Sequence, residues 1–178
     1  MSVLRGIVRL ARFRAEGFAE FDATSRAFLT SLVPLIAFPV LMQITQGLWT
    51  QALFDLFFTT VTLLTPLVVT EFLARRWGRE ALWVRFAVAS NWCQWVLPAM
   101  LMVALLVLRI GAHLGLPMDG NVIAPCLVVL ALYGIVLQWF LARRGLDLSA
   151  GKAVLMVLAA DLSTALLVGV PTMLESVQ

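Results

Sequence analysis

Long apolar runs dominate the sequence, and short polar segments separate them. Five such runs follow one another after residue 25, and few charged residues interrupt them. The runs are continuous rather than alternating, which indicates buried or lipid-facing helices and argues against half-buried strands. Each has at least about the 20 residues that a helix needs to cross a bilayer. The predicted spans lie near residues 27–44, 52–74, 82–108, 122–142 and 153–174.

The third run is longer than one crossing requires, so its helix should tilt or bend. Pro98 lies inside this run. Proline lacks the backbone N–H that a helix interior needs, and it is a common cause of kinks. The sequence therefore predicts a hinge at Pro98.

The first 24 residues have a different pattern, in which charges are mixed with apolar residues. On a helical wheel over residues 4–21, one face collects the apolar side chains of Leu4, Ile7, Val8, Ala11 and Phe18. The opposite face collects the charged side chains of Arg5, Arg9, Arg12, Glu16 and Glu20. Such a helix lies in the membrane interface, and we expect Arg5, Arg9 and Arg12 to contact lipid headgroups.

The predicted fold is an all-α integral membrane protein. An amphipathic interfacial helix in residues 1–24 precedes a five-helix transmembrane domain in residues 25–178. Composition agrees with this class, because 62% of the 178 residues are apolar and 13% are charged. A soluble domain is about half apolar and one quarter charged.

The basic residues predict the orientation. They form short clusters between the apolar runs rather than one patch for nucleic acid, and the net charge is +3. With five spans, every basic residue except Arg109 falls on one side. Basic loops stay in the cytoplasm. We therefore expect a cytoplasmic amino terminus, a carboxyl terminus on the opposite side, and contact with anionic lipid but not with nucleic acid.

Polar groups inside the spans are the candidates for function, because they are costly in a bilayer. Counted from the inner helix ends at about 1.5 Å per residue, Asp161 lies roughly 12–14 Å deep. Four other polar residues reach a similar depth on three other spans, and Asn91 and Gln94 are three apart on one of them. The predicted cluster consists of Asp161, Asn91, Gln94, Tyr133 and Thr65.

Two interpretations of this cluster remain open. Asp161 could be a proton or substrate site, or it could hold helices together through hydrogen bonds. Arg85 is the nearest cation in depth. Among the other polar residues, Glu71 can pair with Arg75 at i,i+4. Thr62 is expected to bond back to its own helix.

The sequence lacks the residue sets that metal centres, haem groups and hydrolase active sites require. His113 is the single histidine, and Cys93 and Cys126 lie in separate apolar runs. Haem and zinc centres usually need several histidine or cysteine ligands, so no cofactor and no metal is expected. No phosphate-binding loop or catalytic triad is present, and a single intramembrane acid is too little for an embedded hydrolase. The sequence therefore predicts a protein that is not an enzyme, with a lipid-modifying enzyme as the weakest option.

Two short motifs carry a resemblance. The stretch 85–95 contains the step Asn91-Trp-Cys-Gln94, and the fourth span ends in Trp139-Phe-Leu-Ala-Arg143 before the span with Asp161. These resemble small bacterial inner-membrane proteins that look like distant relatives of the Yip1 type. The resemblance implies an inner-membrane location, helical packing and partner binding without a cofactor. An interfacial helix is expected here in place of the long amino-terminal domain of the Yip1 group.

Two functions follow as hypotheses. The first is a non-catalytic accessory subunit or scaffold that packs against helices of other membrane proteins, or against further copies of itself. The alternative is a small permease or proton-linked transporter that uses Asp161, Asn91 and Gln94. A dry and fully hydrogen-bonded Asp161 would favour the scaffold, and a polar cavity open to one side would favour the transporter.

Overall fold

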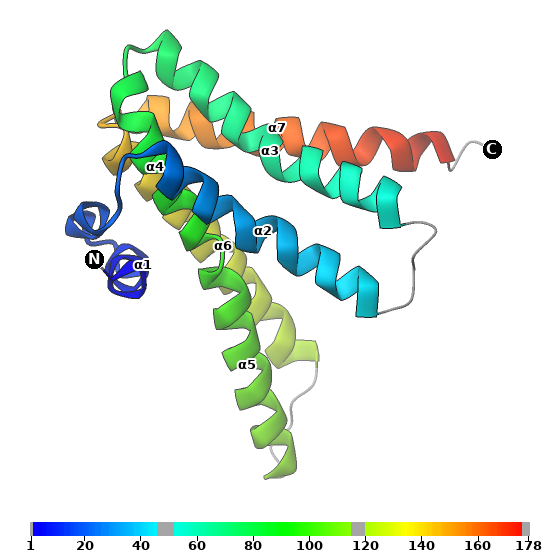
Figure 1. Cartoon of the computed structure of the whole chain (residues 1–178). Helices are drawn as coiled ribbons and strands as arrows, with labels where there is room; N and C mark the ends of the chain where they lie inside the picture. The colour runs from blue at the N-terminus through cyan, green and yellow to red at the C-terminus, as the bar shows by residue number, and fades with distance from the viewer. Residues whose placement is uncertain (1, 46–51, 115–119, 176–178) are drawn as a thin grey trace.

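The computed structural model describes residues 2–45, 52–114 and 120–175, and all regular structure in these ranges is helical (Figure 1). The helices are α1 (Val3–Ala11), the short 3-10 helix η1 (Ala15–Glu20), α2 (Ser25–Thr45), α3 (Ala52–Arg76), α4 (Glu80–Cys93), α5 (Val96–His113), α6 (Gly120–Gly145) and α7 (Ala150–Glu175). The predicted all-α class is confirmed. Residues 46–51 and 115–119, in two predicted outer connections, lie outside the described ranges.

Within the described ranges, 4 helical stretches are long and apolar enough to cross a membrane. They are Leu56–Arg76, Glu80–Gly111, Ile123–Gly145 and Ala150–Gly169. The first predicted span, 27–44, is also helical and lies within α2, but its apolar stretch Ser25–Pro39 is shorter than the others. By length and composition the chain is therefore a helical membrane protein with four such helices.

The long third run is interrupted, but not at Pro98. Helix α4 ends at Cys93 and α5 begins at Val96, so Pro98 is the third residue of α5. Proline has no N–H to donate to the carbonyl four residues earlier, and its ring clashes with that carbonyl. For Pro98 the affected carbonyl belongs to Gln94, which lies in the break. The predicted hinge is therefore one helical turn too late.

The amino-terminal segment is two short helices rather than the single helix predicted over residues 4–21. Helix α1 ends at Ala11, and Phe13 has a positive φ of 57° before η1 begins at Ala15. The ring of Phe13 packs edge-on against Tyr133 and Phe140, with centroids 5.6 and 5.5 Å apart. This aromatic docking onto α6 accompanies the left-handed turn, which a helical wheel does not include.

The two short helices pack closely because of their glycines. A Cβ atom at Gly17 would lie 2.7 Å from Cγ of Leu10 and 2.9 Å from the carbonyl oxygen of Gly6. Any larger residue at Gly17 would push η1 away from α1. Leu10 is fully buried in this contact, whereas Leu4 on the same helix is 75% exposed.

One end of the molecule gathers the connections that carry the arginines. The α3–α4 and α6–α7 connections meet there through an ion pair between Arg79 and Asp147 at 3.3 Å. Lys152 also lies over the ring of Trp77, 5.6 Å from its centroid. From this shared end, α3 and α7 run side by side in one direction, whereas α5 and the first half of α6 run in another (Figure 1).

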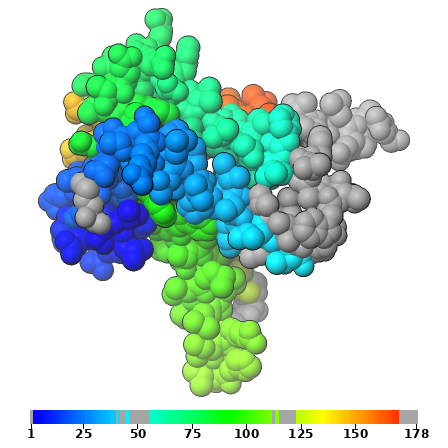
Figure 2. Space-filling model, in the orientation of Figure 1, coloured from blue at the N-terminus to red at the C-terminus, as the bar shows by residue number. Residues whose placement is uncertain are grey.

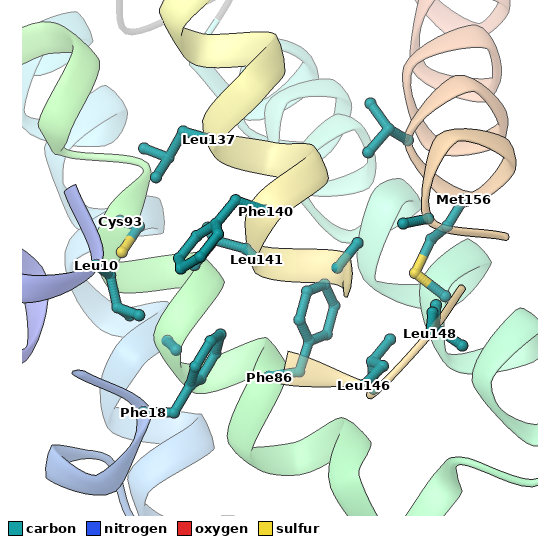
Figure 3. Close-up of a cluster of buried hydrophobic side chains, with 14 of the residues drawn as sticks. Leu10, Phe18, Phe86, Cys93, Leu137, Phe140, Leu141, Leu146, Leu148 and Met156 are labelled. Carbon is teal, nitrogen blue, oxygen red and sulfur yellow. The ribbon is translucent and has the colours of Figure 1, made fainter. Parts of the chain in front are cut away.

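The buried core lies at this shared end (Figure 3). Side chains from α1, η1, α4, α6 and α7 meet in it, together with two leucines of the α6–α7 connection. Its labelled members are Leu10, Phe18, Phe86, Cys93, Leu137, Phe140, Leu141, Leu146, Leu148 and Met156. The amino-terminal segment is therefore part of the same core as the long helices.

Away from this core, large apolar side chains are exposed along the long helices. Examples are Phe57 and Phe72 on α3, Val129 on α6 and Leu158 on α7. Such surfaces are stable in lipid, because acyl chains are as apolar as these side chains. The exposed faces agree with a protein embedded in a membrane.

Candidate functional site

A partly open cavity of about 730 Å³ lies between α3, α6, α7 and the α4–α5 break. Most of its wall is apolar, and every one of these elements also contributes a polar side chain. The polar residues that line it are Thr62, Thr70, Ser90, Gln94, Gln138, Asp161 and Thr164. Four helical segments thus bring hydrogen-bonding groups to one space inside the predicted spanning region.

Asp161 lines this cavity from α7, and its side chain is exposed to the open space. Across the described ranges, no ion pair and no side-chain hydrogen bond engages its carboxylate. Arg85, the expected cation, forms no ion pair with it. Ser163 and Thr164 donate to the carbonyl oxygen of Ala160 instead, at 2.8 and 2.9 Å. Within the described residues, the carboxylate of Asp161 is therefore exposed to the cavity and has no hydrogen-bond partner.

Gln94 shares the cavity with Asp161, as predicted, because it lies in the α4–α5 break. Pro98 also lines the cavity, one turn further along. Gln94 thus lies where the carbonyl opposite Pro98 loses its helical hydrogen bond, and both residues line the cavity. Gln94 and Asp161 thus line the same space, and no hydrogen bond joins their side chains in the part of the chain that the structure describes.

Asn91 does not join this site, contrary to the prediction. Its side chain is 0% exposed, and Nδ2 donates to Oγ of Ser31 on α2 at 2.9 Å. Oγ of Ser31 in turn donates to the carbonyl oxygen of Phe28 at 2.7 Å. Residues three apart on a helix point about 60° away from each other. Asn91 therefore faces α2, whereas Gln94 faces the cavity.

Tyr133 and Thr65 are also absent from the cavity lining, contrary to the prediction. The hydroxyl of Tyr133 donates to the carbonyl oxygen of Ala11 at 2.7 Å, which ties α6 to the amino-terminal segment. The hydroxyl of Thr65 donates to the carbonyl oxygen of Val61 in its own helix at 2.7 Å. Matching residues by depth selects a layer, but it does not say which face of each helix the side chain occupies.

The sequence analysis did not place several of the polar lining residues in a site, among them Gln138 and Thr62. Gln138 lies on α6 one turn beyond Gly134, and both line the cavity. A lone glutamine in an apolar run is a signal that was available. Thr62 was expected to bond back to its own helix, but its buried Oγ1 has no hydrogen-bond partner among the described residues.

Gly134 sets the close approach of α5 to α6 at the cavity wall. A Cβ atom at this position would lie 2.8 Å from Cδ1 of Leu97, so a larger residue would push the two helices apart. The Gly134–Leu97 contact lets α5 lie close to α6, and both residues line the cavity.

The three arginines predicted to contact lipid headgroups differ in their surroundings. Arg5 and Arg12 are exposed, and neither forms an ion pair within the described ranges. Nη1 of Arg9, in contrast, lies 3.0 Å from Oε1 of Glu20, which holds α1 against η1. The predicted pair between Glu71 and Arg75 is confirmed, at 2.6 Å.

The cavity lining combines an apolar wall with several polar side chains. A carboxylate, two carboxamides and a hydroxyl with free hydrogen-bonding capacity can take up a proton, a small cation or a hydrogen-bond donor. The described side chains of His, Cys, Asp and Glu form no group of three that could hold a metal ion. Comparison of the chain with protein-family models, curated proteins and solved structures gives no match.

Proposed function

We propose that the chain is a small non-catalytic permease, in which Asp161 takes up a proton or a small cation inside the membrane. The observation that carries the proposal is the carboxylate of Asp161, which has no partner among the described residues and lines a cavity together with Gln94 and Gln138. An ionisable group inside a bilayer is costly, and it typically marks an ion or substrate pathway.

The membrane arrangement that supports this role has five crossings. Helix α2 packs against α3 and α4, and it starts at the end where the arginines gather. Helix α3 ends where the arginines gather, which is also where α2 starts. Helix α2 therefore runs away from this end, as a first membrane crossing would. The gathered arginines favour a cytoplasmic location for this end and for the amino terminus, in a bacterial inner membrane.

The transport proposal is tested with purified protein in liposomes. We expect proton, Na⁺ or K⁺ flux under an imposed membrane potential, measured with ion-sensitive dyes, and loss of that flux in Asp161→Asn. Asp147→Asn is the matched control, because Asp147 is an exposed acid in the α6–α7 connection. No flux above that of empty liposomes, or equal flux in both variants, would contradict the proposal.

An accessory subunit or scaffold is the second candidate. The observation that favours it is the divergence of the α5–α6 pair from α3 and α7 (Figure 1), together with the partly open cavity that Asp161 lines. A cationic side chain of the partner would form an ion pair with the carboxylate of Asp161, and a partner N–H group would donate a hydrogen bond to it. The resemblance to Yip1-type proteins implies the same kind of role.

Photo-crosslinking in native membranes separates the two candidates. A crosslinker at Val168 faces the cavity, whereas one at Leu166 is exposed on the same helix outside the cavity lining. A single protein adduct at Val168 that disappears in Asp161→Asn supports the subunit, and an adduct with a second copy of this chain identifies a homo-oligomer. Adducts of equal strength at both positions would contradict a specific partner.

A further inference from the structure

A second groove lies on the surface of the molecule, away from Asp161. Its volume is about 630 Å³, and it runs along α2 beside Trp92 of α4. The residues that line it are Arg26, Leu29, Thr30, Val33, Pro34 and Trp92. In the space-filling view α2 lies on the face toward the viewer, so this helix is open to the surroundings (Figure 2).

The groove is charged at one end and apolar along the rest of its length. Arg26 lies in the first turn of α2, at the end of the molecule where the arginines gather. Leu29 and Val33 follow at helical spacing on the same side, and each is 62% exposed. Thr30 adds little polarity, because its hydroxyl donates to the carbonyl oxygen of Arg26 at 2.8 Å.

Arg26 has a free positive charge. Its side chain is exposed, and across residues 2–45, 52–114 and 120–175 it forms no ion pair. Arg9 and Arg75 at the same end, in contrast, pair with Glu20 and Glu71. Arg26 is therefore available to an anion that reaches the groove from outside the chain.

The length of the groove matches one leaflet of a bilayer. Residues 26 and 34 of a helix are about 12 Å apart along its axis. Half of the hydrocarbon core of a bilayer is about 15 Å thick. A molecule with a negative head beside Arg26 and an apolar tail along Leu29 and Val33 would therefore have the proportions of a phospholipid.

We propose that this groove binds an anionic phospholipid. The phosphate pairs with Arg26, and one acyl chain lies along Leu29, Val33 and Pro34 against the ring of Trp92. Basic side chains beside membrane helices on the cytoplasmic side are suited to anionic headgroups. The groove is lined by different residues from the Asp161 cavity, so the proposal is independent of transport.

The test is native mass spectrometry of the delipidated protein with phosphatidylglycerol or phosphatidylcholine of equal chain length. We expect the wild type to prefer phosphatidylglycerol. Arg26→Ala should weaken phosphatidylglycerol binding about fivefold, which is the loss expected for one arginine near an anionic headgroup. Arg26→Lys keeps the charge and should retain most of the preference.

Two groups of variants separate the groove from general surface charge. Arg144→Ala is the matched control, because Arg144 is exposed in the last turn of α6 and does not line the groove. Val33→Trp fills the groove, keeps Arg26 and should weaken binding of both lipids. Leu29→Trp repeats this steric test, and thermal unfolding verifies that both variants fold.

The lipid proposal is wrong if Arg26→Ala and Arg144→Ala weaken phosphatidylglycerol binding equally, because the attraction is then a diffuse surface effect. It is also wrong if folded Val33→Trp and Leu29→Trp bind both lipids like the wild type. Dimers that form through this face in place of lipid adducts would identify a second copy of the chain as the occupant.

Discussion

The two ends of this molecule differ in how their polar and apolar groups are satisfied. At the end where the arginines gather, leucines and phenylalanines from α1, η1, α4, α6 and α7 form a buried core, and Arg9 and Arg79 have acidic partners. Beyond this end the helices diverge, and Asp161 and Thr62 line a cavity without side-chain partners among the described residues. The side chains of the first region stabilise the fold. The polar side chains of the second region are available to form hydrogen bonds with a ligand.

This difference separates the groups that fold the chain from the groups available to a ligand. The core fixes the near ends of α3, α6 and α7, so their cavity side chains keep their positions without bonding to one another. Among the described cavity residues, Thr62 has a buried hydroxyl without a partner, which costs free energy. Substitutions in the two regions should therefore affect different measurements.

The largest expected effect is the loss of a core side chain. Leu10→Ala should lower the free energy of unfolding by about 3 kcal/mol, because Leu10 is fully buried. Leu4→Ala on the same helix is the control and should change it by less than about 0.5 kcal/mol. Equilibrium unfolding in mixed detergent micelles measures both. Equal losses would mean that α1 is not anchored through Leu10.

A smaller effect should distinguish two polar residues that sequence reasoning placed together. Asn91→Ala should cost about 1–2 kcal/mol, because it removes the hydrogen bond to Ser31 and leaves a small void. Asp161→Ala should cost less than about 0.5 kcal/mol, because its carboxylate has no partner to lose. If the same unfolding assay gave the larger loss for Asp161→Ala, the carboxylate would have to be bonded within the protein.

The smallest effect concerns the contact between α6 and the amino-terminal segment. Tyr133→Phe keeps the edge-on packing against Phe13 but removes the hydrogen bond to the carbonyl oxygen of Ala11. We expect a loss of about 1 kcal/mol. Faster hydrogen exchange should be confined to α1 and η1. Exchange that rises equally in α7 would show that the bond supports the whole core rather than this segment.

The long-range pattern of the sequence predicted most of the fold. The runs at 52–74, 122–142 and 153–174 coincide with α3, α6 and α7, because continuous apolar sequence has few alternatives to a helix in lipid. Local detail was less predictable. The left-handed turn at Phe13 accompanies packing against Tyr133 and Phe140, two residues more than a hundred positions away.

The candidate site was predicted only in part, for a geometric reason. Helical rise gives the depth of a side chain, but the rotation of each helix about its axis depends on what it packs against. Asp161 and Gln94 happen to face the same cavity, whereas Asn91 turns toward Ser31 and Tyr133 toward Ala11. Gln138 lies only four residues from the predicted inner end of its span, so it falls outside the layer at the depth of Asp161.

Water in the cavity beside Asp161 is the central claim, and cysteine labelling tests it most directly. In a background with Cys93→Ala and Cys126→Ser, Gln138→Cys places a thiol on the cavity wall. Ile135→Cys places one on the same helix outside the cavity lining, where Ile135 is exposed on an apolar face. Thiols react as thiolates, which need water. A membrane-impermeant maleimide should label Gln138→Cys from one side of the membrane and leave Ile135→Cys unlabelled; equal labelling of both, or of neither, would contradict a hydrated cavity.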